Sequence, residues 1–324
     1  MGASPMRKRL EPQIHGRRPC HVMPFSLIQP LSELPLAFVD VETTGASADL
    51  GDRIIEIGIV RYENGQKVAE YEQLINPRRR IGPGITALTG ITAAMCENQP
   101  TFQEQFEPMM AILRGAVVLG HNVRFDLSFL AREFARCRCD ISQMLEKAPV
   151  LDTVRIARRR FGRGGNGLQR LCRRLGYEPP IAHRALPDAI TTAYVFERLI
   201  EPVGHWTICL CDAMAQQGGP MGLANPSPKA QLLPLELEEA LDQKCPVMME
   251  YLDANDQRTQ RIIQPLSIRK RKGELGLIAF CQLRNDRRTF KLERIVQITK
   301  LDEHQPDPPA TPATLFDLPP SAQT

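Results

Sequence analysis

Two carboxylates stand one residue apart in the stretch FVDVETTG. Asp40 and Glu42 lie inside an apolar run that predicts a strand directed into a core. Because side chains alternate along a strand, both carboxylates would point to one side while Val39 and Val41 face the other. Like charges that lose their hydration side by side are unstable unless cations neutralise them, and carboxylate oxygens suit hard divalent cations. The pair predicts half of a metal site; two solvated acids at an exposed strand end are the alternative.

Two later acids and a histidine extend this hypothesis. Asp126 shares its predicted helical face with Phe129 and Leu130, at i+3 and i+4, so its carboxylate should point inward. Asp188 falls in the first turn of a predicted helix, where an acid also simply complements the helix dipole. His183 stands five residues earlier, on a loop that could reach over a site. These positions add a second group of metal-binding candidates to the first pair.

Four carboxylates and one histidine are the groups that two-metal phosphoryl chemistry uses. Cations ~3.5–4 Å apart act on the attacking water and on the leaving oxygen. A histidine, whose ordinary pKa is ~6.5, can take a proton from that water near neutral pH. A further acid, Asp152 in VLDTV, is predicted to cap its helix instead of binding a metal.

The elements that must position these residues alternate between strands and helices, which is typical of an α/β fold. Strands are expected at 35–45, 53–66, 68–77 and 116–121, with Asn64 and Gly65 forming a hairpin turn. Helices are expected at 102–115, 123–137, 150–162, 168–176 and 186–200, the last with Pro187 near its first turn.

The stretches FVDVETTG, GHNVRFDLSFL and HRALPDA have the order and spacing of the three exonuclease motifs of the DEDD superfamily. The chain resembles the histidine-containing branch, which includes the proofreading epsilon subunit of bacterial DNA polymerase III. The segments INP, LTGIT, LDTVRIARR and LQRLCRRLGY also resemble that family, so the resemblance covers roughly Leu34 to Leu199. Three ordered motifs make a specific match, whereas one alone would not.

The resemblance implies a ribonuclease-H-like exonuclease domain, a mixed sheet flanked by helices, that removes nucleotides in the 3′→5′ direction. It implies two Mg²⁺ or Mn²⁺ ions and makes His183 the general base. It implies that the backbone around Thr43, Thr44 and Gly45 holds the terminal nucleotide. The metal ligands that it assigns are Asp40, Glu42, Asp126 and Asp188.

A second region follows a segment rich in Gly, Pro, Ser and Asn. Four β-like runs, 247–253, 258–270, 275–284 and 288–301, are separated by short turns and predict a small antiparallel sheet or barrel. Residues 246–301 hold twelve Lys and Arg against six Asp and Glu, which suggests an anionic partner such as nucleic acid. A solvated basic face is the alternative.

This second region resembles the WYL domain, a small SH3-like β-barrel. The residues that match the pattern of that family are Tyr251, Arg261, Pro265, Arg284, Arg288, Phe290 and Arg294. The resemblance implies that the arginines and Tyr251 bind a negatively charged ligand or nucleic acid. Leu275-Gly276-Leu277 stands where the Trp-Tyr-Leu of the family is expected, which removes two aromatic side chains on which bases could stack.

The domain division predicted from these patterns has five parts. They are a basic leader (1–33), the exonuclease domain (34–203), a linker (204–232), the WYL-like barrel (233–303) and a proline-rich tail (304–324). Leader and tail are expected to be disordered. The nine cysteines show no paired CxxC motif and read as reduced thiols of a cytoplasmic protein, and no run is long enough for a membrane span.

The function predicted from the sequence is a metal-dependent 3′→5′ exonuclease for single-stranded or frayed DNA ends, with a basic domain for nucleic acid or an anionic ligand. One alternative is an exoribonuclease. Another is a catalytically silent regulator that senses a ligand or nucleic acid. A DNA polymerase or, through ATLFDLPP in the tail, a sliding clamp are candidate partners.

Overall fold

The computed structural model describes residues 25–145, 147–179, 182–223, 233, 235–253, 257–271 and 274–301. The predicted tail and its clamp-like ATLFDLPP peptide lie outside the described residues, as do residues 1–24 of the predicted leader and 224–232 of the predicted linker. Among the helices of the described part of the chain, none is both long and apolar enough to cross a membrane.

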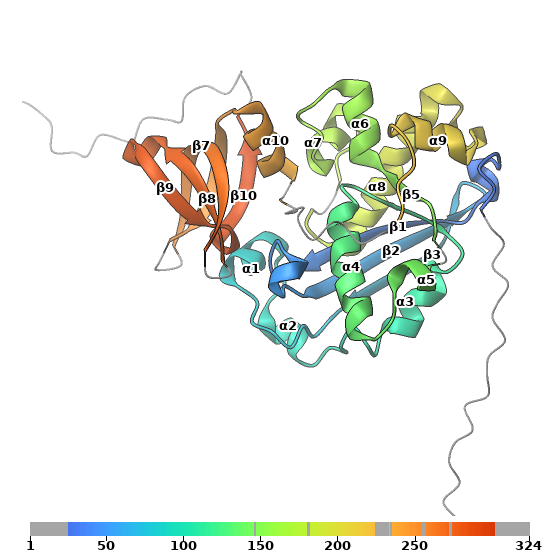
Figure 1. The fold of residues 1–324 in the computed structure, drawn as a ribbon, viewed down its shortest axis with the longest axis horizontal. Helices are drawn as coiled ribbons and strands as arrows, with labels where there is room; N and C mark the ends of the chain where they lie inside the picture. Colours follow the sequence, from blue (N-terminus) through green and yellow to red (C-terminus); the bar gives the residue numbers. More distant parts are fainter. Residues whose placement is uncertain are drawn as a thin grey trace, which may run out of the picture.

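A mixed five-stranded sheet forms the centre of the first unit, which we call the nuclease unit (Figure 1). The order is β3-β2-β1-β4-β5, in which β1 runs antiparallel to β2 and parallel to β4. The strands are β1 (Leu36–Thr43), β2 (Ile54–Glu63), β3 (Gln66–Leu74), β4 (Val117–Gly120) and β5 (Val150–Asp152). The mixed sheet and the Asn64-Gly65 hairpin turn are confirmed, whereas Val150–Asp152 is a strand and not the start of a helix.

Helices cover both faces of this sheet. Alternate β1 residues Ala37, Val39 and Val41 pack in a core with α3 (Phe106–Leu113) and α4 (Arg124–Arg136). Leu36 and Phe38 pack on the other side in a core that holds residues of the helices α6 (Thr153–Phe161), α7 (Leu168–Arg174), α8 (Ala185–Ile200) and α9 (Leu210–Gln216). The row on the α8 side then continues from Leu36 and Phe38 into Asp40 and Glu42, because side chains alternate along a strand.

Smaller elements complete the nuclease unit. Helices α1 (Pro83–Thr89) and α2 (Ala93–Glu97) pack on Ile55 of β2 through a separate apolar cluster, and α5 (Ile141–Met144) follows α4. The remaining short turns are the 3-10 helices η1 (Leu31–Glu33), η2 (Ala48–Leu50), η3 (Glu201–Val203) and η4 (His205–Thr207).

The nuclease unit is larger than the sequence predicted. Leu31 and Leu34, assigned to the leader and the domain edge, are buried, and Pro30 bridges to Cys209. The expected linker from residue 204 is wrong over its first part, because residues 205–223 form η4 and α9 and supply buried apolar side chains to both cores. The apolar side chains of these residues gain more from burial than a solvated linker allows.

The second unit, which we call the C-terminal unit, is one helix beside an antiparallel sheet of order β10-β6-β7-β8-β9. Its elements are α10 (Leu235–Gln243), β6 (Val247–Leu252), β7 (Arg258–Arg271), β8 (Glu274–Cys281), η5 (Gln282–Arg284), β9 (Asp286–Lys291), η6 (Leu292–Arg294) and β10 (Ile295–Lys300). The last predicted run is thus two strands separated by η6. Among the described residues no ladder joins β9 to β10, so the sheet is open and the closed barrel is not confirmed.

Within the described residues, contacts between the two units are seen at two places. Helix α1 contacts β6, β10 and η6, where the Arg258 guanidinium donates from Nη2 to the carbonyl oxygen of Ala87 at 3.2 Å. Helix α10 meets the segment between α6 and α7, and Figure 1 shows it beside these two helices. The C-terminal unit is therefore packed on the nuclease unit through polar contacts as well as through the chain.

Candidate active site

The first candidate pair lies at the end of β1. Asp40 and Glu42 are half-buried on the face of the sheet that carries α8. Each stands beside β2, where Gly58 pairs with Asp40 and Glu56 with Glu42. The predicted common side of the two carboxylates is therefore retained, and their partial exposure leaves one side of the pair accessible.

Asp126 approaches the same strand from the first turn of α4. Its side chain is only 4% exposed, and Oδ1 accepts a hydrogen bond from the backbone N–H of Val41 at 3.0 Å. Val41 lies between Asp40 and Glu42, so this bond fixes the Asp126 carboxylate beside the pair. The inward orientation predicted from the helical spacing is confirmed.

Asp188 approaches from the first turn of α8 and is also buried. Its Oδ2 accepts from the backbone N–H of His183 at 2.8 Å, and its Oδ1 accepts from Gln169 Nε2 at 3.3 Å. The His183 backbone has a φ of 60°, which turns the chain sharply just before the helix. One ligand atom each of Glu42, His183 and Asp188 lie within 4.8 Å of one another. Three elements thus converge on one point.

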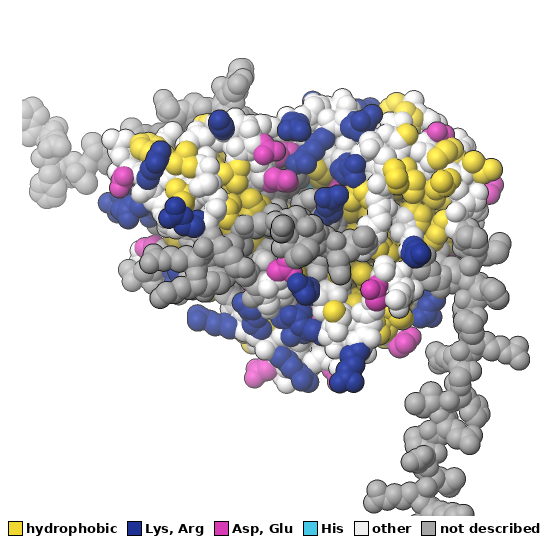
Figure 2. Space-filling view, viewed as in Figure 1, with side chains coloured by type: hydrophobic (Ala, Val, Ile, Leu, Met, Phe, Trp, Pro, Cys, Tyr) yellow, Lys and Arg dark blue, Asp and Glu magenta, His cyan; other side chains and the backbone are white. Residues whose placement is uncertain are grey.

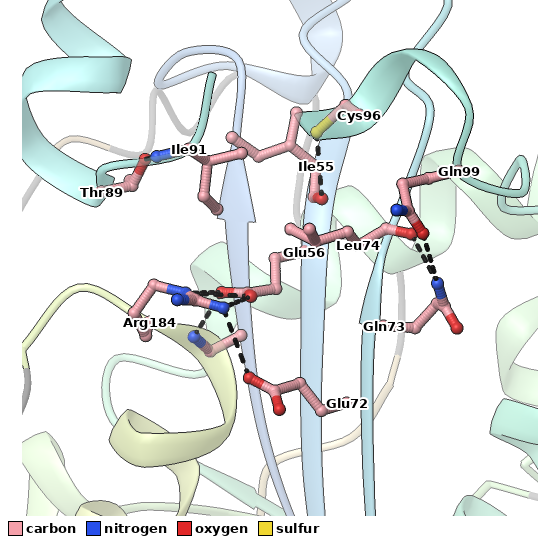
Figure 3. A network of polar contacts seen from close by, with 11 residues as sticks. Ile55, Glu56, Glu72, Gln73, Leu74, Thr89, Ile91, Cys96, Gln99 and Arg184 are labelled. Carbon is pink, nitrogen blue, oxygen red and sulfur yellow. Dashed lines mark hydrogen bonds and ion pairs between the residues drawn. The ribbon is translucent and has the colours of Figure 1, made fainter. Parts of the chain in front are cut away.

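A fifth buried acid, which the sequence reasoning missed, holds the histidine loop in place. Glu56 is fully buried and accepts from Arg184 Nε at 3.0 Å and from the Ala185 backbone N–H at 2.9 Å (Figure 3). Arg184 also reaches Glu72 on β3 at 3.5 Å. The signal was present, since Glu56 lies in the apolar run RIIEIG just as Asp40 lies in FVDV.

Gly58 allows α8 to begin close to β2. A Cβ atom at this position would lie 2.2 Å from the backbone carbon of Ala185, which is too close for any side chain. The missing side chain therefore lets the N-terminus of α8 rest on the strand next to Asp40. This contact brings Asp188 toward the β1 pair.

Burial raises the pKa of each of the four carboxyl groups predicted to bind metal, which are Asp40, Glu42, Asp126 and Asp188. For Asp40 and Glu42, burial and then the neighbouring acids hold the pKa well above its usual range. Burial raises the pKa of Asp126 to about 8 and that of Asp188 to about 7, against the backbone N–H groups that lower them. Burial lowers the pKa of His183, which favours the neutral imidazole. These acids thus have too little positive charge nearby to stabilise their ionised forms.

The donor set fits divalent cations. Four carboxyl groups that mutually disfavour ionisation, with ligand atoms of three residues inside 4.8 Å, are the arrangement that hard cations stabilise. Arg184 faces the cluster but is already paired with Glu56 and so neutralises only part of its charge.

The turn after β1 is rigid. Thr44 donates from its backbone to the Arg53 carbonyl at 2.8 Å, and its Oγ1 accepts from the Arg53 N–H at 3.0 Å. Thr43 Oγ1 donates to the Gly45 carbonyl at 2.7 Å. A Cβ on Gly45 would lie 2.6 Å from Asp52 Oδ2. The three residues expected to hold the terminal nucleotide therefore form a fixed turn directly after Glu42.

Asp152 is a helix cap, as predicted. Its Oδ1 accepts from the N–H groups of Val154 at 2.9 Å and Asn122 at 3.1 Å. His205 Nε2 lies 3.0 Å from Glu197 Oε1, while the nearby Cys209 and Cys211 place their sulfur atoms 3.0 Å apart.

The candidate residues of the C-terminal unit do not converge as the nuclease residues do. Tyr251 packs edge-on against Phe290 and accepts from the Lys291 N–H, while Pro265 lies in β7 opposite Ala279. Arg261 donates to Thr259, and Arg294 donates to the Asp253 carbonyl. Arg284 and Arg288 are exposed, and the described residues give them no ion-pair partner.

Comparison with known proteins agrees with both units. The family described as Exonuclease matches residues 37–196, and the family described as WYL domain matches residues 234–300. The DNA polymerase III subunit epsilon of Treponema pallidum is 36% identical over 164 residues, which are 50% of this chain and 74% of that protein.

Two further relatives are much longer than this chain. The 3′-5′ exonuclease DinG of Bacillus subtilis is 38% identical over 164 residues, covering 50% of this chain and 17% of that protein. The DNA polymerase III subunit epsilon-like protein of Rhodobacter capsulatus is 39% identical over 176 residues, covering 53% of this chain and 24% of that protein. The chain spans less than a quarter of the length of these two proteins.

The matches, the mixed sheet and the ordered acidic motifs lead to one assignment. The chain belongs to the exonuclease family that includes the bacterial DNA polymerase III epsilon subunits, with a ribonuclease-H-like α/β fold followed by a WYL domain.

Proposed function

We propose that the protein is a metal-dependent 3′→5′ exonuclease that releases nucleotides from single-stranded or frayed DNA ends. The observation that carries the proposal is the convergence of Glu42, His183 and Asp188 within 4.8 Å, with Asp40 and Asp126 in the same electrostatic cluster. Relatives named as DNA polymerase III subunits and as a 3′-5′ exonuclease support DNA as the substrate.

In this proposal Asp40, Glu42, Asp126 and Asp188 hold two Mg²⁺ or Mn²⁺ ions. When bound, such ions polarise the scissile phosphate, activate a water and stabilise the leaving oxygen. The carboxylates fix these positions because each is tied to a rigid element, Asp126 by the Val41 N–H and Asp188 by the His183 N–H.

In this proposal His183 is the general base, and its nearness to Glu42 and Asp188 supports that role. Its lowered pKa keeps the imidazole neutral at pH 7, so a ring nitrogen can accept the proton of the attacking water. Glu56 positions it, because its carboxylate accepts hydrogen bonds from Arg184 and Ala185, the two residues that follow His183. The turn at Thr43, Thr44 and Gly45 offers backbone groups to the terminal nucleotide.

The C-terminal unit is proposed to bind nucleic acid or another anionic ligand. Arg284 and Arg288 are its strongest candidates because they are exposed and unpaired among the described residues. Arg261 and Arg294 have partners within the unit, so binding through them would require those contacts to change. Tyr251 supports β9 through Lys291 and Phe290.

A 5′-labelled single-stranded oligonucleotide, as DNA and as RNA, tests the proposal. The purified full chain is incubated with Mg²⁺, Mn²⁺ or EDTA, beside the Asp40→Ala variant. We expect a metal-dependent ladder that shortens from the 3′ end of DNA and disappears in the variant. A ladder on RNA alone would make the protein an exoribonuclease. Binding without any ladder would favour a catalytically silent regulator.

A further inference from the structure

Helix α10 belongs to the C-terminal unit, but it contacts the nuclease unit close to the candidate active site. It lies against the segment 162–167, which joins α6 to α7 (Figure 1). Figure 2 shows acidic and basic side chains side by side where α10 meets these helices. The guanidinium of Arg158 on α6 lies 3.4 Å from Glu238 Oε2 through Nη2 and 4.0 Å from Glu239 Oε1 through Nε. A basic side chain of α6 is thus engaged by an acidic helix of the other unit.

The contact centres on a buried carboxylate. Glu239 is 5% exposed, and its Oε2 accepts from the backbone N–H of Gly165 at 2.9 Å. Its Oε1 lies 3.4 Å from Nδ2 of Asn166, which is fully buried and also donates to the Gly162 carbonyl at 3.0 Å. A carboxylate and an amide buried together in this way organise a loop, since removing either leaves buried polar groups without a partner.

The approach of α10 to this loop is close. A Cβ atom on Gly167 would lie 2.3 Å from Glu236 Oε1. Gly167 is the N-cap residue of α7, so α10 contacts the start of that helix.

Helix α7 leads directly to the proposed metal ligands. Gln169, in its first turn, donates from Nε2 to Asp188 Oδ1 at 3.3 Å. The His183 N–H binds the other Asp188 oxygen, Oδ2. The Gln169 side chain therefore orients the Oδ1 side of this carboxylate. A continuous series of contacts runs from Glu239 through 165–167 and Gln169 to Asp188.

We propose that α10 is a brace through which the C-terminal unit positions Gln169, and through it Asp188, for metal binding. The inference rests on the proposed function in taking Asp188 as a metal ligand. In this proposal Glu239 and Gln169 are positioning residues, because both act on the metal site through Asp188. Loss of an outer partner of a metal ligand typically lowers metal affinity or activity by 10–100-fold.

The first experiment tests the brace without reference to catalysis. Amide hydrogen exchange is measured on the full chain as wild type, Glu239→Ala and Asp242→Ala. Asp242 is an exposed acid on the same helix for which no partner is seen in the described residues. We expect faster exchange across 162–168 in Glu239→Ala only, with β1 unchanged in all three proteins. Equal exchange in the two variants would overturn the brace.

The second experiment tests the coupling to the metal site. Calorimetric titration with Mn²⁺, without substrate, and hydrolysis of a single-stranded DNA oligonucleotide at varied Mg²⁺ are compared for Glu239→Ala, Gln169→Ala and the double variant. We expect about tenfold weaker metal binding and a matching rise in the Mg²⁺ needed for half-maximal rate in each single variant. KM for the oligonucleotide at saturating Mg²⁺ should be unchanged.

The double variant is decisive because the effects of two substitutions along one series of contacts are not additive. We expect it to equal the more affected single variant, and Asp242→Ala to equal wild type. Additive losses would mean that Glu239 acts elsewhere, and faster hydrolysis in Glu239→Ala would mean that α10 competes with the substrate. Either result overturns the inference. A wild type that binds Mn²⁺ but cleaves nothing would refute the proposed function, while the Mn²⁺ comparison would still decide the inference.

Discussion

Both units gather charges of one sign, but they hold them in different ways. In the nuclease unit the acids on β1, α4 and α8 converge, and the backbone N–H groups of Val41 and His183 fix two of them. In the C-terminal unit Arg284 and Arg288 stand exposed on η5 and β9. The acids are held together by the elements that carry them, whereas the arginines are exposed to water.

This difference between buried acids and exposed arginines shows which charges need a bound partner for stability. Burial raises the pKa of Asp126 and Asp188 by making ionisation costly, so a cation at the acids stabilises the folded protein. The exposed arginines lose little hydration and need no partner for stability. We therefore expect changes at the acids to alter both catalysis and stability, and changes at the arginines to alter binding alone.

The largest effect is expected from Asp40→Asn. Losing one charged group from such a centre should lower kcat on the order of 10²–10³-fold. The metal-free variant should also melt at a higher temperature at pH 8 than the metal-free wild type, because one of the mutually repelling charges is gone. Single-turnover hydrolysis and calorimetry measure the two effects. Glu107→Gln, an exposed acid on α3, is the control. A variant that keeps its rate would exclude Asp40 as a metal ligand.

The sequence already indicated both expected effects of Asp40→Asn, the loss of rate and the gain in stability. Asp40, Glu42 and Asp126 could be predicted because each is a charge at a position where periodicity demands an apolar side chain. Glu56 shows the same signal in RIIEIG, but its pairing with Arg184, 128 positions apart along the chain, could not be predicted. Gln169 and Glu239 could not be predicted, since their roles depend on contacts such as Glu239 with Gly165, 74 positions apart along the chain. The strand, helix and hairpin patterns of the nuclease unit were also visible, while the packing of 205–223 was hidden behind an apparent linker composition.

Gly58→Ala tests whether the acids converge because α8 touches β2. The added methyl would meet the Ala185 backbone, which belongs to the helix itself and cannot rotate away. Overpacking of this kind costs about 1–3 kcal/mol of unfolding free energy. Because the N-terminus of α8 must shift, metal binding should also weaken, measured by Mn²⁺ titration beside urea unfolding. Unchanged stability and metal affinity would show that the helix start is not held by this contact.

The stability of the metal-free protein should fall as pH rises. The unfolded chain has Asp pKa values near 3.8, whereas folding raises those of Asp126 and Asp188 to about 8 and about 7. Between these limits the folded state binds more protons than the unfolded state, so the free energy of unfolding decreases with pH. In EDTA, melting temperatures measured from pH 5 to 8 should decline less steeply for Asp126→Asn than for wild type. Parallel curves would contradict the raised pKa of Asp126.

The smallest effect is expected from replacing the exposed arginines of the C-terminal unit. Replacing Arg284 and Arg288 together by Gln should leave hydrolysis of a dinucleotide unchanged but weaken binding of a long single strand. Each lost phosphate contact should reduce the slope of log K against log salt by about 1. Arg287→Gln, compared with Arg288→Gln alone, is the matched control, because it removes one charge from the neighbouring position of β9, whose side chain faces the other side of the strand. If the control flattens the slope equally, charge alone attracts the strand. If neither does, the C-terminal unit acts on the nuclease through α10 and not through the substrate.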